Sequence, residues 1–437
     1  MTINAQQSGA PAKRGPIERL LSPLAEVRAG EGATVLMMAA TMCGLLAAYY
    51  FLKSAREPLI LTQGGAAVKT YSSAGQAFLL ALLIPLYSSI ASKVRRIQLV
   101  GGLAIFFLLN LVLFVVLGMS GVREGVAYFI WVGIFNVFVI SQFWAFANDL
   151  YSEDQGKRLF PIVGLGASLG AFIGAKAAEP LAKQKGPYVL MISGGLLLAV
   201  SVGLLYAVYL RERPETRPGG AKKLAGGDGF ALVMRDRYLV LIAALIVMLN
   251  VVNTSGEFIL SEMVTSHAQA TYTDTSAEEK FIGGFYANYY SWFNLLSLLL
   301  QTFFVSRVFK YIGVAGALFL LPGIALVGYL FFLVSPILGV ARWLKIAENS
   351  VDYSVQNTSN QALFLVTSPE VKYKAKAAID TFFMRLGDVL QAAIVYFGLQ
   401  LGMGVKQFAM LNLALIAVWS VAVFALAKEY RQRAIAQ

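Results

Sequence analysis

The chain has 437 residues and is strongly apolar, with 58% hydrophobic residues and only 14% charged residues. Its mean hydropathy of +0.66 lies far above that of water-soluble domains, so the composition indicates an integral membrane protein with many spans. The formal net charge is +12. Because the basic residues are spread over many short loops, membrane topology and anionic lipid headgroups explain the excess, and we expect no nucleic-acid partner.

Apolar runs long enough to cross about 30 Å of hydrocarbon predict twelve transmembrane helices. These predicted spans begin near Ala33, Gln76, Leu99, Val126, Arg158, Pro187, Tyr238, Ile282, Val314, Pro336, Ala375 and Phe408. The tenth and the eleventh are the weakest by hydropathy. The polar N-terminal segment contains no apolar stretch of the kind found in signal peptides, so we expect no cleavable signal.

Basic residues recur on alternate loops, which supports an even number of spans. They follow the second, fourth, eighth and tenth predicted spans, at Lys93, Arg95, Arg96, Lys157, Arg158, Arg307, Lys310, Lys372, Lys374 and Lys376. Both termini and the middle loop are basic as well. By the positive-inside rule, we expect all these loops and both termini to be cytoplasmic.

A segment rich in proline, glycine and charge predicts a cytoplasmic linker near the middle of the chain. The expected domains are a tail at 1–32, a six-helix bundle at 33–211, the linker at 212–237, a second six-helix bundle at 238–428 and a tail at 429–437. Short similar stretches lie about half a chain apart, since SAREPLIL starts at Ser54 and SGEFIL starts at Ser255. Two parallel six-helix repeats in an all-α integral membrane protein are the arrangement of major-facilitator-type transporters.

The tenth predicted span, residues 334–366, carries more polar side chains than a purely structural membrane helix tolerates. One charge near the bilayer centre costs about 2.5 to 3.5 kcal/mol, so Arg342, Lys345 and Asp352 together cost roughly 7 to 10 kcal/mol. The polar positions recur three to four residues apart and therefore share one helical face. They are Arg342, Lys345, Glu348, Asp352, Gln356 and Asn360. We expect this face to line a water-filled cavity.

A second charged cluster lies on the first predicted span, where Lys53, Arg56 and Glu57 share one helical face before Pro58. One interpretation is an anion-binding cluster on a cavity wall, and the other is that both cations reach the lipid headgroups. Glu57 favours the first interpretation, because a carboxylate gains nothing from headgroup phosphates and needs a cationic partner.

Two cytoplasmic loops at equivalent places in the two halves predict a gate. They hold Asp149, Lys157 and Arg158 between the fourth and fifth spans, and Glu370, Lys374 and Lys376 between the tenth and eleventh. In rocker-type transporters such loops approach each other when the carrier faces outward, and a plain loop salt bridge is the alternative interpretation.

Three further patterns concern packing and orientation. Gly164, Gly166, Gly170 and Gly174 in the fifth span predict close helix packing. The cluster of Tyr286, Tyr289, Tyr290, Trp292 and Phe293 in the eighth span favours an interfacial aromatic belt over a surface that stacks on a planar ring. In the eleventh span, Asp380, Asp388 and Gln391 share one broad face that we expect to point inward, while Arg385 either joins them or pairs with the tenth span.

His267 is the sole histidine and Cys43 the sole cysteine, so we expect no metal site, no intramolecular disulfide and no cofactor. The sequence contains no catalytic triad, metal-ligand set or nucleophile motif. We therefore do not expect an enzyme.

Three blocks of the sequence resemble the ATP/ADP translocase family of nucleotide transport proteins, found in intracellular bacteria and plastids. They are FLKSAREPLIL at the first span, FWAFANDLYSEDQGKRLFPIVGLGASLGAFIGA at the fourth and fifth, and VDYSVQNTSNQALFLVTSPEVKYKAKAAIDTFFMRLGD at the tenth and eleventh. The resemblance implies a twelve-span fold of the major-facilitator type, nucleotide exchange of the ATP:ADP antiport kind, and a place in the bacterial inner membrane.

The family's charged motif at the first span falls on Lys53, Arg56 and Glu57 with its charge signs kept, and its Lys-Ala-Ala-Ile-Asp motif falls on 376–380. Two acidic residues of the family are missing, because their positions fall near Val132 and Asn253. The resemblance therefore also admits a relative that carries another anion.

These patterns together predict a monomeric secondary transporter of a nucleotide or related anionic metabolite that works by alternating access. The expected substrate-binding residues are Lys53, Arg56, Glu57, Arg342, Lys345, Glu348, Asp352, Gln356, Asp380 and Arg385. The alternative is a proton-coupled carrier of another organic anion, a zwitterion or a peptide-like solute, with the proton on Glu257, Glu348 or Asp352.

Overall fold

A computed structural model describes residues 15–23, 25–91, 93–212 and 226–435. These residues form helices and contain no strand. The α-helices are α1 (Pro16–Leu21), α2 (Gly32–Ala91), α3 (Arg96–Met119), α4 (Gly125–Leu150), α5 (Glu153–Lys185), α6 (Pro187–Glu212), α7 (Gly226–Arg235), α8 (Arg237–Thr271), α9 (Thr275–Leu299), α10 (Val305–Ala317), α11 (Leu320–Val334), α12 (Leu338–Val351), α13 (Asn357–Leu363), α14 (Pro369–Ala378), α15 (Met384–Gln400) and α16 (Val405–Ile435). Short π-helical turns, η1 (Leu300–Phe304), η2 (Asp352–Gln356) and η4 (Ile379–Phe383), and a 3₁₀ turn, η3 (Phe364–Val366), join some of them.

Within the described residues, nine helices are long and apolar enough to cross a membrane. Three predicted spans are not counted among these nine. The second continues α2 beyond a break at Gly65, the ninth is the shorter apolar helix α11, and the tenth is the polar segment α12–η2–α13. The protein is thus a multi-pass membrane protein, and the number of twelve spans stays a prediction.

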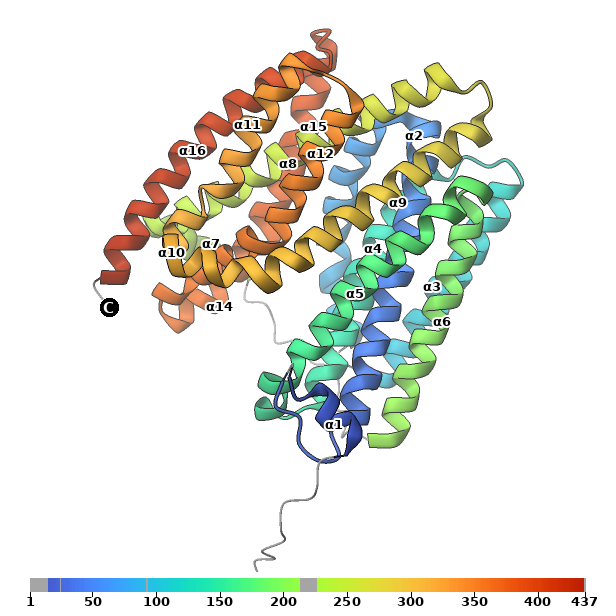
Figure 1. Cartoon of the computed structure of the whole chain (residues 1–437), viewed down its shortest axis with the longest axis vertical. Helices are drawn as coiled ribbons and strands as arrows, with labels where there is room; N and C mark the ends of the chain where they lie inside the picture. The colour runs from blue at the N-terminus through green and yellow to red at the C-terminus, as the bar shows by residue number, and fades with distance from the viewer. Residues whose placement is uncertain (1–14, 24, 92, 213–225, 436–437) are drawn as a thin grey trace, which may run out of the picture.

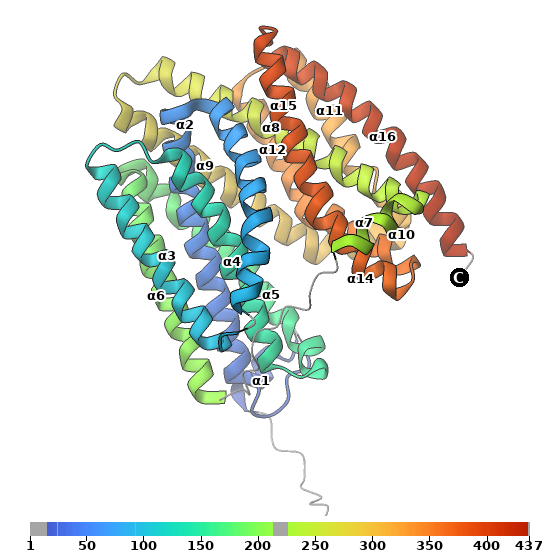
Figure 2. The same cartoon turned by 180° about the vertical axis from the view of Figure 1, so that it is seen from behind.

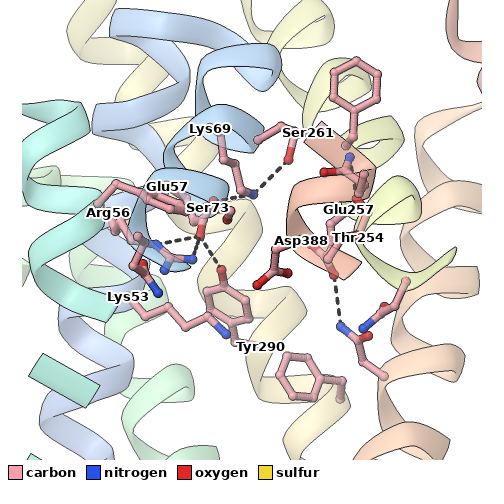
Figure 3. Close-up of a pocket in the computed structure, with 18 of the residues that line it drawn as sticks. Lys53, Arg56, Glu57, Lys69, Ser73, Thr254, Glu257, Ser261, Tyr290 and Asp388 are labelled. Atoms are coloured by element: carbon pink, nitrogen blue, oxygen red, sulfur yellow. Dashed lines mark hydrogen bonds and ion pairs between the residues drawn. The ribbon is translucent and has the colours of Figure 1, made fainter. Parts of the chain in front are cut away.

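The break in α2 at Gly65 lets one continuous segment supply two antiparallel helices. Gly65 has φ +74° and ψ −178°, a conformation that side chains with a Cβ rarely adopt. The chain therefore folds back at this glycine. Residues that follow it, such as Lys69, return along the helix that holds Glu57 (Figure 3).

The helices gather into two bundles, α2–α6 on one side and α8 with α10–α16 on the other, and α9 runs between them (Figures 1 and 2). One hydrophobic cluster is built mainly from residues before 209 and the other mainly from residues after 232. The bundles meet where α2 and α5 contact α8, α9 and α15. In its described part, from residue 226, the segment predicted as a linker forms the helix α7, which packs against α14.

The glycines of α5 allow its close approach to α2. A Cβ placed on Gly166 or Gly170 would collide with the backbone of Ala39 or Cys43, respectively. A Cβ on Gly174 would lie 2.5 Å from the Cα of Ala47. The packing role predicted for these glycines is therefore confirmed for Gly166, Gly170 and Gly174, whereas a Cβ on Gly164 would meet open space.

Candidate functional site

A central cavity lies between the two bundles and is the candidate functional site. It contains about 890 Å³ of empty space, part of which is continuous with solvent. Residues of α2, α4, α8, α9, α12, η2 and α15 line it (Figure 3). They are Lys53, Arg56, Glu57, Lys69, Thr70, Ser73, Gln76, Phe129, Asn253, Thr254, Glu257, Phe258, Ser261, Tyr290, Phe293, Asn349, Tyr353, Asp388 and Gln391.

Glu57 is the centre of a buried polar network on the α2 wall. Its side chain is 0% exposed. One carboxylate oxygen accepts hydrogen bonds from Arg56 and, at 2.8 Å, from the hydroxyl of Tyr290. The other lies 2.7 Å from the Nζ atom of Lys69. Glu57 thus has the cationic partners that its sequence position led us to expect.

Polar contacts at this level also tie the two bundles together. Besides the bond from Tyr290 of α9 to Glu57, the Nζ atom of Lys69 donates to the hydroxyl of Ser261 on α8 at 2.9 Å. The hydroxyl of Tyr50 donates to Asn294 of α9 at 3.0 Å. Because these bonds join α2 to α8 and α9, separating the bundles here requires breaking them.

Lys53 is a cation held among aromatic rings. Its Nζ atom lies 4.3 Å from the ring centroid of Tyr290 and 5.5 Å from that of Tyr50. Among the described side chains, no carboxylate lies within ion-pair distance of it. Cation–π contacts stabilise a lysine but leave its hydrogen-bond donors open. Lys53 is therefore a positive group on the cavity wall that can accept an anionic partner.

The opposite wall of the cavity carries two carboxylates, and each also has a cation near it. The Nζ atom of Lys345 lies 3.9 Å from Glu257, and Arg385 lies 3.3 Å from Asp388. Glu257 of α8 accepts hydrogen bonds from the hydroxyl of Tyr289 at 2.7 Å and from Asn349 at 3.1 Å. Asp388 of α15 accepts one from Asn250 at 3.0 Å. Figure 3 shows these carboxylates across the cavity from the cations of α2. The cations that line the cavity are therefore all on α2, whereas the opposite wall carries carboxylates whose charge is partly offset by Lys345 and Arg385.

The tenth predicted span reaches the cavity through side chains other than the predicted ones. Asn349 and Tyr353 are its lining residues. The following predicted substrate-binding residues are not among the residues that line the cavity: Arg342, Lys345, Glu348, Asp352, Gln356, Asp380 and Arg385. The prediction that the charged face lines the cavity in this conformation is therefore wrong, and a role of these seven residues in binding substrate stays a prediction.

Local contacts explain why these charged side chains do not line the cavity. Lys345 is buried against α8, where its Nζ atom donates to the side chain of Asn253 at 2.5 Å and lies 2.8 Å from Glu348. Farther along the chain, Asp380 pairs with Lys376 at 2.6 Å. These charges are offset inside one bundle instead of in the cavity.

Two more of the predicted residues, Arg385 and Gln356, are held by near neighbours. Arg385 lies 3.3 Å from Asp388, so its predicted alternative of pairing with the tenth span is not what the structure has. The side-chain amide of Gln356 donates to Asn360 at 2.9 Å. Asp352 opens the π-helical turn η2 and is half-buried. A π-helical turn changes the phase of the helical face, which periodicity alone did not predict.

Lys157 and Arg158 of the predicted gate pair within their own bundle in this conformation. Lys157 pairs with Glu153 at 2.7 Å, and Arg158 pairs with Glu31 at 2.9 Å. The side chain of Glu370 lies outside the described part of the structure. The start of α5, which follows Asp149, and α14, which holds Lys374, lie at the same end of the molecule in different bundles (Figure 2). The gate stays a prediction, because it concerns the other conformation.

Sequence reasoning missed Lys69 and misplaced the tyrosines of α9. Lys69 was missed because the predicted second span began at Gln76, so the lysine was assigned to a loop. Tyr286 and Tyr289 are 0% exposed and Tyr290 is 3% exposed, so the prediction of an interfacial belt is wrong for them. Trp292, at 40% exposed, fits the belt. The consecutive glycines Gly64 and Gly65 were the available signal, because a turn placed there puts Lys69 on the second span.

Solved structures of transporters share this fold. A bacterial homologue of the human lysosomal transporter Spinster, in an inward-facing and unoccupied conformation, matches with a TM-score of 0.62 and 12% identity over 92% of this chain and 98% of that one. The nucleoside transporter NupG matches with a TM-score of 0.60 and 12% identity over 90% of this chain and 98% of that one. The protein has the all-α membrane fold of major-facilitator-type transporters.

Among curated proteins, the similarity is to ADP,ATP carrier proteins, which confirms the resemblance found in the sequence. "ADP,ATP carrier protein 1" of Chlamydia pneumoniae is 23% identical over 340 residues, which are 65% of this chain and 63% of that protein. "ADP,ATP carrier protein 4" of Rickettsia felis is 23% identical over 295 residues, or 58% of this chain and 56% of that protein. The matches thus span less than two thirds of these relatives, and no family model matches the chain.

Proposed function

We propose that this protein is a secondary active transporter that carries a nucleotide or a related anionic metabolite across the bacterial inner membrane by alternating access. The observation that carries the proposal is the row of cations from α2 on the wall of the central cavity. The similarity to ADP,ATP carrier proteins supports exchange of the ATP:ADP type as the first candidate activity.

The α2 wall suits a phosphate-bearing ligand. Lys53 has no carboxylate partner among the described residues, while Arg56 and Lys69 share the single carboxylate of Glu57. Three cations against one carboxylate leave this wall positive. A guanidinium can bind a phosphate with two parallel hydrogen bonds, and an ammonium acts as a point charge beside it.

Aromatic rings beside these cations suit the planar part of such a ligand. Phe129, Tyr290, Phe293 and Tyr353 all line the cavity. Stacking of a base on an aromatic ring contributes about 1 to 3 kcal/mol and tolerates different bases. The cations that line the cavity are on α2, so we infer that a bound nucleotide places its phosphates toward α2.

The contacts between bundles suggest how binding is coupled to movement. A phosphate that binds Arg56 and Lys69 competes with Glu57 for both cations. Weakening the Glu57 network would also weaken the bonds that join α2 to Tyr290 and Ser261 across the bundles. We infer that substrate lowers the barrier to rocking of one bundle against the other, as alternating access requires.

The second candidate is a proton-coupled carrier of another organic anion, a zwitterion or a peptide-like solute. The carboxylates of Glu257 and Asp388 in the cavity favour it, because a membrane-embedded carboxylate beside the substrate can carry the coupling proton. The family's acidic residues are missing near Val132 and Asn253, which also favours a substrate other than ATP and ADP.

Uptake into proteoliposomes tests the proposal. We expect labelled ATP, ADP or a related anion to enter vesicles preloaded with unlabelled substrate and to enter empty vesicles much more slowly. Lys53→Gln should abolish most of this uptake, whereas Lys310→Gln, an exposed lysine of α10, should not. Uptake into empty vesicles that follows an imposed pH gradient would support the proton-coupled carrier instead. No uptake of any anion in a panel of nucleotides and carboxylates would contradict both.

A further inference from the structure

A second groove lies away from the central cavity, where the C-terminal end of α5 meets the first turns of α9 and α12. We call it the α5/α9/α12 groove. It contains about 970 Å³ of space and is open to the surroundings. It is lined by Lys183, Tyr272, Ala277, Lys280, Phe281, Gly284, Phe285, Asn288 and Arg342. None of these residues lines the central cavity.

A chain of hydrogen bonds forms the floor of this groove and crosses from one bundle to α9 and α12. Glu179 of α5 lies 2.7 Å from the Nζ atom of Lys183 and accepts a hydrogen bond from Asn288 of α9 at 2.9 Å. Arg342 of α12 donates to the same asparagine side chain. Gly284 gives Lys183 its path over α9, because a Cβ there would lie 2.5 Å from the lysine Cγ atom.

The groove carries more positive than negative charge. Glu179 is shared by Lys183 and by Lys176, which lies 2.9 Å away. In the described structure, neither Lys280 nor Arg342 has a carboxylate within ion-pair distance. The Nε atom of Arg342 is buried and has no hydrogen-bond partner. Lys280 and Arg342 are thus cations on the groove without a carboxylate partner in the described part of the chain, and charge-assisted hydrogen bonds make such groups suited to an anion.

An apolar groove adjoins the cationic one. It is lined by Val327, Gly328, Phe331, Ile337, Gly339, Val340, Trp343 and Leu344 of α11, α12 and the turn between them. Trp343 lines the apolar groove, and its ring centroid lies 5.5 Å from the guanidinium carbon of Arg342, which lines the cationic groove. It also contacts Trp292 with a centroid distance of 5.6 Å, and the two indoles are 50% and 40% exposed. Exposed tryptophans beside cations are typical of the headgroup level of a membrane.

From these two grooves we infer a binding site for an anionic phospholipid. The lipid phosphate lies in the α5/α9/α12 groove near Lys280 and Arg342, and one acyl chain lies in the apolar groove along α11 and α12. A soluble anion would explain the cations but not the apolar groove beside Arg342. Because the site joins α5 to α9 and α12, the bound lipid stabilises the conformation in which these helices are in contact. This inference does not depend on which solute the central cavity carries.

Native mass spectrometry of the full chain with phosphatidylglycerol or phosphatidylcholine tests the inference. We expect the wild-type protein to retain phosphatidylglycerol in preference to phosphatidylcholine. Lys280→Gln combined with Arg342→Gln should lower the affinity of one phosphatidylglycerol by about tenfold or more, because each cation near a membrane surface contributes on the order of fivefold. Lys310→Gln is the matched control, since this lysine also lies beside an exposed aromatic ring, Tyr311, on another part of the molecule.

A third variant separates a lipid from a soluble anion. Gly339→Phe fills the apolar groove, where an added side chain meets open space, and should weaken phosphatidylglycerol binding while leaving the cations in place. Equal retention in the wild type and the double variant would overturn the inference. So would displacement of the lipid by inorganic phosphate together with unchanged retention in Gly339→Phe. Lys280→Gln alone breaks no hydrogen bond seen in the structure. If the double variant misfolds, phosphatidylglycerol binding by this single variant serves as the test.

Discussion

Glu57 determines how positive the α2 wall of the cavity is. It is buried between Arg56 and Lys69, so its single charge offsets only part of theirs and none of the charge on Lys53. Removing one member of a buried ion pair leaves an uncompensated charge, which costs about 3 to 5 kcal/mol in typical proteins. A substitution of Arg56 therefore has two consequences, the loss of a possible ligand for substrate and the exposure of Glu57, and an experiment has to separate them.

We predict that Arg56→Ala lowers substrate affinity by roughly 1.5 to 3 kcal/mol, the scale of a hydrogen bond to a charged group. Arg56→Lys should recover only part, because the planar fork is lost. Equilibrium binding of substrate to purified protein measures both. In Arg56→Ala combined with Glu57→Gln the unpaired carboxylate is gone, so affinity should stay low if Arg56 binds substrate. Recovery of wild-type affinity in the double variant would mean that Arg56 serves only to neutralise Glu57.

A second residue-scale prediction concerns Glu31, which precedes α2. Hydrogen bonds from Arg158 lower the pKa of Glu31 from its ordinary value of 4.5 to about 2. Because the pKa is lower in the folded protein, the stabilisation is present above about pH 4.5 and is lost as the pH falls toward 2. Glu31→Gln should therefore lower the thermal unfolding temperature at pH 7, and the difference from wild type should shrink between pH 4.5 and pH 3.

The control for this measurement is Glu153→Gln. Glu153 pairs with Lys157 on the surface, where the carboxylate side chain is 85% exposed. Exposed pairs contribute little. A difference between wild type and Glu31→Gln that is independent of pH would show that the ion pair with Arg158 is not its cause.

At the scale of elements, close approach of helix backbones at glycines holds the first bundle together. In a membrane, lipid tails are as apolar as helix surfaces, so close packing of small residues does more for association than hydrophobicity does. The face of α5 that holds Gly166, Gly170 and Gly174 rests on α2 in this way. The same helix contacts α9 on another side, so α5 positions both the cavity wall of α2 and the boundary with the second bundle.

We predict that Gly170→Ala destabilises the protein by about 1 to 3 kcal/mol, the usual cost of adding volume to a packed site. The added Cβ would collide with the backbone at Cys43, which cannot turn away as a side chain can. Gly164→Ala on the same helix is the matched control, because its Cβ meets open space and alanine favours helix. Thermal unfolding in detergent measures both, and equal unfolding temperatures would contradict the packing argument.

At the scale of the whole molecule, alternating access requires that the two ends of the bundle boundary open in turn. In this structure α5 and α9 are in close contact at one end, where a Cβ on Gly283 would lie 3.3 Å from that of Ala182. At the other end, Lys157, Arg158 and Lys376 of the predicted gate make ion pairs within their own bundles. A rocking mechanism needs two states, and it predicts a second one in which this contact between α5 and α9 opens.

Cysteine pairs at the two ends should crosslink in opposite conditions. Ala182→Cys with Gly283→Cys brings two Cβ atoms to disulfide distance in this conformation and should crosslink readily. Lys157→Cys with Lys376→Cys should crosslink only when the gate closes. Both are made in a chain whose sole cysteine, Cys43, is replaced. A substrate that shifts the conformation should raise one yield while it lowers the other. Parallel changes in both yields would contradict a rocking movement.

The sequence by itself determined the class of protein and the first charged cluster. Long apolar runs require membrane helices, whatever their neighbours. Lys53, Arg56 and Glu57 lie three to four residues apart on one helix, so their common face follows from helical geometry. The packing glycines of α5 could be recognised for the same reason, because their spacing on one helix is a local property.

Only the tertiary structure decided which groups meet across helices. Lys69 reaches Glu57 because the chain folds back at Gly65, and Tyr290 reaches the same carboxylate from the other bundle. On the tenth predicted span, periodicity placed the polar residues on one face, but packing against α8 buries Lys345 behind the lining residues Asn253 and Glu257. The polar face of a helix follows from the spacing of its own residues. The direction in which that face points depends on the helices that pack against it, and the spacing of residues along one helix does not show this direction.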